Sequence, residues 1–262
     1  MDSPGAVLHL YDAQMRQDPI VDLGARVERV GPVVRVLGKD NYVIFSDLDD
    51  SNVQSVVAEQ AEFFRRAGLP VEWKLFGHDR PKRLEQCLCD AGFVPEEPET
   101  LVVFDLRDGT PGGDPSAEVE VRHVADPAGV NDAARAANAA FGPDGEDHSA
   151  RYAEMARDPN QGLFVAYLEG APVASGRLDL PPGRSFAGMF GGGTAPPYRH
   201  QGVYRALVRA RAEYAAARGF RFLTVDARES SRPILERLGF VTLTTTTPWV
   251  LRPSDPAARE TT

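Results

Sequence analysis

A strand that leads through a proline-bounded turn into a long helix is the feature of this sequence that most constrains its fold. Residues 186–190 (Phe-Ala-Gly-Met-Phe) predict a short buried strand that ends in the glycines 191–193. After the turn, apolar side chains with helical spacing predict a helix that Gly219 closes: Val203, Leu207, Ala210, Tyr214 and Ala217. The first N–H groups of a helix lack partners within it, and the helix dipole attracts negative charge. The turn therefore predicts an anion site.

Regular elements surround this turn from residue 118 to residue 252. Strict alternation of apolar and polar residues at 118–122 predicts an edge strand. A helix at 126–141 follows, then a second helix that ends near residue 157 and strands at 163–168, 172–180 and 186–190. After the long helix come a strand at 222–226, a helix at 231–238 and a closing strand to about residue 251.

The turn resembles a known cofactor loop. Residues 199–204 (Arg-His-Gln-Gly-Val-Tyr) are similar to the pyrophosphate loop of the GNAT superfamily of N-acetyltransferases, with Arg199 at its first position and Gly202 as its first glycine. Tyr204 departs from that pattern, because a small residue is usual there. The Leu-Glu-Arg-Leu-Gly-Phe segment at 235–240 is also similar to the helix that precedes the last hairpin of that fold. The resemblance implies an α+β domain, with a mixed, mostly antiparallel sheet flanked by helices in three layers.

The resemblance implies acetyl-coenzyme A as the cosubstrate. The thioester would lie where the strand that begins at residue 186 parts from the strand 222–226. Backbone groups and side chains around the turn would hold the coenzyme: Gly193, Thr194, Ala195, Arg199, His200, Gln201, Gly202, Val203, Tyr204, Arg205 and Ser231. Ser231 has a second interpretation as a plain helix N-cap.

Acetyl transfer from a thioester to an amine requires a deprotonated amine, a polarised carbonyl and a proton for the leaving thiolate. The family often supplies a tyrosine as the acid at the position that Leu235 occupies here, and leucine cannot donate a proton. We predict Asp226 as the base or substrate anchor and Tyr204 as a candidate acid. A surface aspartate in a turn is the other interpretation of Asp226. The acidic loop at 146–148 either grips the acceptor or is only solvated.

The first half of the chain repeats the order of the second half, which predicts two GNAT-like domains in tandem. Its repeat consists of a strand at 42–45, a helix at 52–66, a strand at 71–76, a helix at 81–91, Gly92-Phe93 and a strand at 101–104. The turn 46–51 corresponds to the anion site, but it has three aspartates and neither glycine nor arginine. These carboxylates would repel a pyrophosphate, and Ser51 or Asp50 is expected to cap the helix.

The predicted domains follow from this repeat and from a segment rich in Gly and Pro between its halves. A degenerate GNAT-like domain covers 1–106, a linker 107–117, a GNAT N-acetyltransferase domain 118–253 and a tail 254–262. The degenerate domain is expected to serve as a wall, lid or substrate platform, so each chain should bind one coenzyme.

Charge and hydropathy exclude several classes of protein. Residues 1–117 hold 12 Lys+Arg against 21 Asp+Glu, whereas residues 118–253 hold 16 Arg, no Lys and 15 Asp+Glu. Neither half is strongly basic, which argues against nucleic-acid binding. The acidic half either confers solubility or attracts a cationic amine. No stretch approaches the ~18 apolar residues of a membrane span, and the sequence shows no signal-peptide pattern. We therefore expect a cytoplasmic protein without a membrane partner.

Cys87 and Cys89 are expected to be packing thiols, and no spacing of His, Cys, Asp and Glu predicts a metal site. The sequence thus predicts a monomeric or homodimeric N-acetyltransferase that moves an acetyl group from acetyl-coenzyme A to a primary amine of a small molecule. Two alternatives stay open. One is a non-catalytic sensor or pseudo-enzyme that binds acyl-coenzyme A, which the missing tyrosine favours. The other is a protein N-acetyltransferase.

Overall fold

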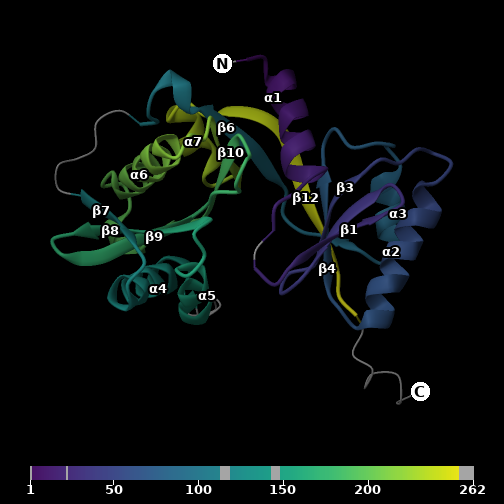
Figure 1. Cartoon of the computed structure of the whole chain (residues 1–262), viewed down its shortest axis with the longest axis horizontal. Coiled ribbons are helices and arrows are strands. Elements are labelled where there is room, and N and C mark those ends of the chain that lie inside the picture. Colours follow the sequence, from purple (N-terminus) through teal and green to yellow (C-terminus); the bar gives the residue numbers. More distant parts are fainter. Residues whose placement is uncertain (1, 22, 113–118, 143–147, 254–262) are drawn as a thin grey trace. The chain divides into compact units, whose positions relative to one another are not determined.

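The computed structural model of the chain describes residues 2–21, 23–112, 119–142 and 148–253 (Figure 1). They form two compact units, each with a sheet and helices packed on it. The C-terminal unit comprises Met1–Val7 and Leu101–Leu243, and the N-terminal unit comprises Leu8–Thr100 and Thr244–Thr262. The predicted α+β class is confirmed.

The C-terminal unit has a mixed sheet with the strand order β6-β11-β10-β9-β8-β7. Its strands are β6 (Glu99–Asp105), β7 (Val119–Val124), β8 (Gln161–Leu168), β9 (Ala171–Asp179), β10 (Phe186–Thr194) and β11 (Phe222–Ala227). Its helices are α4 (Pro127–Phe141), α5 (His148–Met155), α6 (Val203–Ala217) and α7 (Arg232–Arg237). β7 to β10 pair antiparallel, and β10 pairs with β11 in parallel.

Helices cover both faces of this sheet. A Cβ atom added to Gly192 of β10 would meet Tyr204 and Arg211 of α6, whereas one added to Gly193 would meet Phe141 of α4. Because successive residues of a strand point to opposite faces, α6 and α4 lie on opposite faces, as Figure 1 shows. One apolar core lies under α6 and a second lies under α4 and α5. The unit therefore has the three predicted layers.

The N-terminal unit has the strand order β1-β2-β3-β4-β12, with β5 also paired to β12. Its strands are β1 (Arg26–Val30), β2 (Val33–Leu37), β3 (Tyr42–Ser46), β4 (Val71–Phe76), β5 (Val94–Pro95) and β12 (Val241–Leu251), which joins this unit at Thr244. Its helices are α2 (Val53–Ala67) and α3 (Leu84–Asp90), preceded by a π-helical turn (Asp12–Arg16). The helix α1 (Pro4–Tyr11) belongs to this unit only from Leu8 onward. Trp73 of β4 and Trp249 of β12 pack in its core with α2 and α3.

Both units contain the same crossover. In the N-terminal unit α2 connects the parallel strands β3 and β4, and in the C-terminal unit α6 connects the parallel strands β10 and β11. This topology agrees with the predicted repeat. The compact units differ from the predicted sequence-contiguous domains at their last strands, because 101–106 lies in the C-terminal unit and 244–253 in the N-terminal unit. The domain boundaries themselves stay a prediction.

Three local expectations differ from the structure. The strand that begins at Phe186 continues to Thr194 instead of ending in the glycines, because Gly193 and Thr194 pair with β9 and this ladder outweighs the low strand propensity of glycine. The helix expected from residue 81 begins at Leu84. Cys89 is exposed, so only the buried Cys87 acts as a packing thiol.

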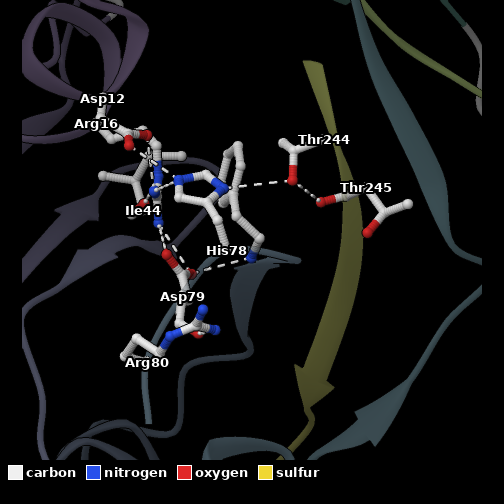
Figure 2. Close-up of polar contacts among 9 residues, drawn as sticks. Asp12, Arg16, Ile44, His78, Asp79, Arg80, Thr244 and Thr245 are labelled. Carbon is white, nitrogen blue, oxygen red and sulfur yellow. Dashed lines mark hydrogen bonds and ion pairs between the residues drawn. The ribbon is translucent and has the colours of Figure 1, made fainter. Parts of the chain in front are cut away.

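Arg16 and His78 organise a polar network inside the N-terminal unit (Figure 2). Arg16 is 1% exposed and donates to both carboxylate oxygens of Asp79 at 2.7 and 2.9 Å and to Asp12 at 2.8 Å. His78 Nε2 lies 2.9 Å from Asp12, and Nδ1 lies 3.3 Å from the Thr244 hydroxyl. Burial raises the pKa of Asp12, but hydrogen bonds with His78 and Arg16 outweigh it and lower that pKa. The network ties the π-helical turn to the segment after β4 and to β12.

Candidate active site

The strands β10 and β11 run in parallel and then part. Their pairing covers only Phe186–Gly188 and Phe222–Thr224, although both strands continue. Beyond these pairs β10 stays bonded to β9 and changes register between Phe190 and Gly193. Backbone groups beyond these pairs do not bond across the two strands, and a ligand that entered there would be able to supply partners for them. This divergence is the point at which the family resemblance implies the thioester.

The turn after β10 presents an open helix N-terminus. A 3₁₀ turn (Pro196–Tyr198) leads to His200 and Gly202, which both have positive φ angles of 65° and 80°. Gly202 is the N-cap residue of α6. Among the described residues, no side chain caps the helix, and apart from the neighbouring residues of the chain no atom lies within 4 Å of a Cβ atom added at Gly202. The first-turn N–H groups of α6, from Val203 onward, thus have no partner within the helix. The geometry is that of an anion site.

The side chains of Arg199 and Gln201 brace this turn. Arg199 Nε donates to the carbonyl of Thr194 at 3.1 Å, and Nη2 donates to the carbonyl of Ala140 in α4 at 3.3 Å. Gln201 Nε2 donates to the carbonyl of Pro197 at 3.1 Å. These bonds fix the turn against β10 and α4, so backbone N–H groups are the principal donors that it offers to an anion.

The end of β10 contains an unsatisfied polar atom. Thr194 is buried, and its hydroxyl has no hydrogen-bond partner within the described part of the chain. Gly193 lies against Phe141 and Ala140, where a Cβ atom would come within 2.7 and 2.9 Å. The N–H of Ala195 already donates to Val173 at 2.9 Å. Gly193, Thr194 and Ala195 were all expected to contact the coenzyme. The Thr194 hydroxyl is unused in this structure, whereas the backbone N–H of Ala195 already has a partner.

Tyr204 and Arg211 lie on the face of α6 that packs against the sheet. Tyr204 is two residues into the helix, and Arg211 follows two turns later. Burial raises the pKa of Tyr204, and interaction with Arg211 opposes that rise only in part. The phenol therefore stays protonated at neutral pH and is able to donate a proton.

Asp226 and Ser231 lie at the end of β11 and at the start of α7. Asp226 is half-buried, two residues beyond the last β10–β11 pair. Ser231 is the N-cap residue of α7, but its hydroxyl donates to the carbonyl of Arg228 at 3.1 Å and caps nothing. Leu235 is fully buried in the core under α6 and α7. Apolar packing explains the leucine at the usual tyrosine position.

The remaining predicted residues are spread around this site. His200 and Arg205 are exposed, and Arg205 lies against Gly112. His148 begins α5 and stacks on Tyr152 with ring centroids 5.3 Å apart. The acidic residues 146 and 147 lie outside the described residues. Among the residues that are described, no three His, Cys, Asp or Glu side chains gather as metal ligands would.

The corresponding turn of the N-terminal unit is filled by its own carboxylate. Asp49 Oδ1 accepts hydrogen bonds from the backbone N–H groups of Ser51 and Asn52 at 2.8 and 3.2 Å and from the Ser51 hydroxyl at 2.6 Å. The expected cap at Ser51 or Asp50 is wrong, because Asn52 is the N-cap residue and Asp49 satisfies the turn. The Ser51 bonds lower the pKa of Asp49. A carboxylate therefore already binds two N–H groups of this turn just before α2, and its charge opposes an anion there.

Comparisons with known proteins identify the C-terminal domain. Residues 130–240 match the acetyltransferase (GNAT) family. This segment is a GNAT domain. No curated protein matches the sequence significantly.

Solved structures share the fold over most of the chain. A GCN5-related N-acetyltransferase from Kribbella flavida has a TM-score of 0.66 at 18% identity, over 97% of this chain and 96% of its own. One from Sphaerobacter thermophilus has a TM-score of 0.62 at 15% identity, over 95% and 86%. A tandem GNAT protein from the clavulanic acid biosynthesis pathway has a TM-score of 0.61 at 13% identity, over 90% and 86%. The predicted tandem GNAT architecture is thus confirmed.

Two residues of the GNAT repeats escaped the sequence analysis. Arg211 interrupts the apolar face of α6 four residues after Leu207, and a charge in that position is the signal that would have found it. Asp49 was only one of three aspartates in its turn. Its hydrogen bonds depend on the local backbone path, so no spacing rule singles it out.

No helix within the described ranges is long and apolar enough to cross a membrane.

Proposed function

We propose that this protein is an N-acetyltransferase that moves an acetyl group from acetyl-coenzyme A to a primary amine of a small molecule. One observation carries the proposal: the same GNAT domain contains an open helix N-terminus at Gly202 and the point at which β10 and β11 separate. The first offers donors to a pyrophosphate, and the second offers backbone groups to the pantetheine arm. The unsatisfied hydroxyl of Thr194 lies between them along the chain.

The residues proposed to bind the coenzyme lie around this turn and at the end of β10. The N–H groups of Val203, Tyr204 and Arg205 would bind the pyrophosphate at the helix N-terminus, with Gly202 leaving room for it. The Thr194 hydroxyl would bind the pantetheine arm, beside Gly193. Arg199 and Gln201 would act by holding the turn, whereas His200, Arg205 and Ser231 would add polar contacts at its edge.

The transfer itself is a direct attack. The amine nitrogen forms a bond to the thioester carbon, the C–S bond breaks, and the product is an amide and a thiol. Asp226 would orient the cationic amine and pass its proton to water, because a typical alkylamine is protonated at neutral pH. Tyr204 would give a proton to the departing thiolate. The acidic first half of the sequence would attract such a cationic acceptor, and we propose a cytoplasmic reaction with a monomeric or homodimeric enzyme.

A non-catalytic acyl-coenzyme A sensor is the second candidate. The buried Leu235 favours it, since the position that often holds the family's acid is part of the apolar core here. The two candidates share coenzyme binding and differ only in turnover.

A thiol-release screen separates them. Acetyl-coenzyme A is incubated with the protein and, in turn, with polyamines, amino acids, aminoglycosides and peptides with free N-termini. Release above the rate without acceptor supports the enzyme and names the acceptor class, with peptides indicating a protein acetyltransferase. Coenzyme binding without release from any acceptor supports the sensor. If acetyl-coenzyme A does not bind at all, both candidates are wrong.

A further inference from the structure

Arg211 carries a buried positive charge on the sheet-facing side of α6. Its side chain is 1% exposed, and it donates to the carbonyls of Leu207 and Arg177, both at 3.2 Å. Its Nη2 is buried and, within the described part of the chain, has no hydrogen-bond partner of ordinary geometry. Of the carboxylates that the structure describes, none pairs with this guanidinium. Burying a charge is costly unless an opposite charge compensates it, so the resting domain leaves this cation under-compensated.

Two glycines hold the guanidinium against the sheet. A Cβ atom added to Gly176 of β9 would lie 2.8 Å from Nη1 of Arg211, and one added to Gly192 of β10 would lie 3.1 Å from Nη2. The same added atom on Gly192 would lie 3.2 Å from the ring of Tyr204. Arg211 and Tyr204 therefore meet at one point of β10. That point is the change of register before Gly193, beside the position proposed for the thioester.

The electrostatics of the two side chains are complementary. Burial lowers the pKa of Arg211 to about 10, so the guanidinium remains charged at neutral pH. The groups that favour its charge are Tyr204 and, from α5, Tyr152. Burial raises the pKa of Tyr204, and Arg211 is the charge that opposes this rise. A phenolate formed at Tyr204 would supply the negative charge that Arg211 lacks.

We propose that Arg211 is a positioning residue that makes Tyr204 a stronger acid in acetyl transfer than it would be without this charge, an inference that rests on the proposed function. As the C–N bond forms and the C–S bond breaks, the Tyr204 hydroxyl gives its proton to the coenzyme thiolate. Arg211 stabilises the resulting phenolate. The proton that the amine loses returns to the phenolate through water, so each turnover restores the neutral phenol.

A purely structural role for Arg211 predicts something different. In that case its bonds to two carbonyls would brace α6 against β9, and its removal would cost stability without changing the acidity of Tyr204. Replacing a buried, poorly compensated charge by an apolar side chain of similar volume is often neutral or stabilising. Stability and acidity therefore separate the two roles.

The kinetic test uses variants of the full chain. Arg211→Met and Tyr204→Phe should each lower kcat by about tenfold or more, with the KM for acetyl-coenzyme A within about threefold of the wild type. The double variant should be no more than about twofold slower than the slower single variant, because the two residues act as a unit. Arg211→Lys keeps the charge and should retain a rate between those of the wild type and Arg211→Met. Arg209→Met, on the same helix but paired with Glu213 at 2.8 Å, is the control and should match the wild type.

A second readout does not depend on turnover. A fluorinated tyrosine is placed at position 204, where its lower intrinsic pKa allows titration, and its fluorine resonance is followed against pH. Arg211→Met should raise this pKa by about one unit or more, corresponding to at least tenfold weaker acidity, and Arg209→Met should leave it unchanged. The melting temperature of Arg211→Met should equal or exceed that of the wild type.

The outcomes are distinguishable. If Arg211→Met leaves the titration of residue 204 unchanged, the inference is wrong, whether or not the wild type catalyses acetyl transfer. The inference is also wrong if the rate losses of the two single variants multiply in the double variant. A shifted titration in a protein that binds acetyl-coenzyme A but releases no thiol supports the Arg211–Tyr204 pairing and overturns only the proposed transfer. If Arg211→Met does not fold, Arg211→Lys decides. A Lys variant that folds normally but has lost the wild-type acidity of Tyr204 shows that positive charge alone is insufficient and contradicts the proposal.

Discussion

The fully buried carboxylate of Asp105 accepts a hydrogen bond from the guanidinium of Arg221 at 3.1 Å. Arg107 donates to the same carboxylate at 2.8 Å, and Arg221 also pairs with Asp2 at 2.8 Å. Burial raises the pKa of Asp105, but the bonds from Arg107 and Arg221 outweigh it and lower that pKa to about 2. The cluster joins the N-terminal residues, the end of β6 and the start of β11 within the C-terminal unit.

Asp105→Asn should therefore lower the free energy of unfolding at pH 7 by about 1–2 kcal/mol, a value reduced for solvent screening of the exposed Arg107. A carboxylate with a depressed pKa stabilises the fold above its unfolded pKa and loses that effect as the pH falls through its folded pKa. The difference between wild type and variant should shrink from pH 4 toward pH 2. Urea unfolding at several pH values measures it, and a difference independent of pH would contradict the assignment.

Arg16→Met should destabilise the N-terminal unit by about 3 kcal/mol, because Asp79, only 5% exposed, would lose its bidentate partner. Arg29→Met is the matched control. Its pair with Asp18 at 3.2 Å joins two exposed side chains and should contribute less than about 1 kcal/mol. Urea unfolding followed by tryptophan fluorescence reports this unit, which contains Trp73 and Trp249. Equal losses in the two variants would show that burial of Arg16 has no energetic consequence.

Gly202→Glu should weaken binding of acetyl-coenzyme A by more than tenfold, or more than ~1.4 kcal/mol, because bulk and negative charge would meet the pyrophosphate. Gly219→Glu controls for backbone strain. It also has a positive φ, of 83°, and open space around its Cβ position, but it follows the C-terminal end of α6. Calorimetry compares the two variants, and unchanged affinity in Gly202→Glu removes the coenzyme from this turn.

One coenzyme should bind per chain, because Asp49 already binds the N–H groups of Ser51 and Asn52 in the turn before α2. Its negative charge would also repel a pyrophosphate. Calorimetric titration should saturate at one acetyl-coenzyme A per chain, and Gly202→Glu should abolish that single site. Saturation at two would show that the N-terminal unit retains coenzyme binding.

Asp226→Asn should lower turnover by about 10²-fold, a typical general-base contribution. The rate of the wild type should rise with pH through one ionisation as the amine loses its proton, without a sharp alkaline fall, since burial raises the pKa of Tyr204. Asp126→Asn is the control, because Asn also caps helices and Asp126 caps α4 away from the proposed site. Thiol release against pH measures both variants. Full activity in Asp226→Asn would contradict a role for Asp226 in the reaction and would make the acidic loop 144–147 the next candidate to bind the acceptor.

The sequence by itself determined the order of most elements from β3 onward and the position of the proposed coenzyme turn, whereas it did not reveal α1, β1 and β2. Spacing of apolar residues marks α6, and Gly202 marks a backbone that needs positive φ. These features are local, because helix periodicity and turn chemistry depend on residues within a few positions of one another. The tandem repeat was also predictable from the sequence, since the same local signals recur in the same order in both halves of the chain.

Only the tertiary structure decided which distant groups meet. Arg211 and Tyr204 contact β10 at Gly192 because strand register and helix packing place them there. The end of β10–β11 pairing at Gly188 and Thr224 likewise depends on the register with β9. In the turn before α2, the tertiary structure decided that Asp49, and neither Asp47 nor Asp50, binds the backbone N–H groups. Burial and pairing across strands are sums over many long-range contacts, so short-range patterns in the sequence do not specify them.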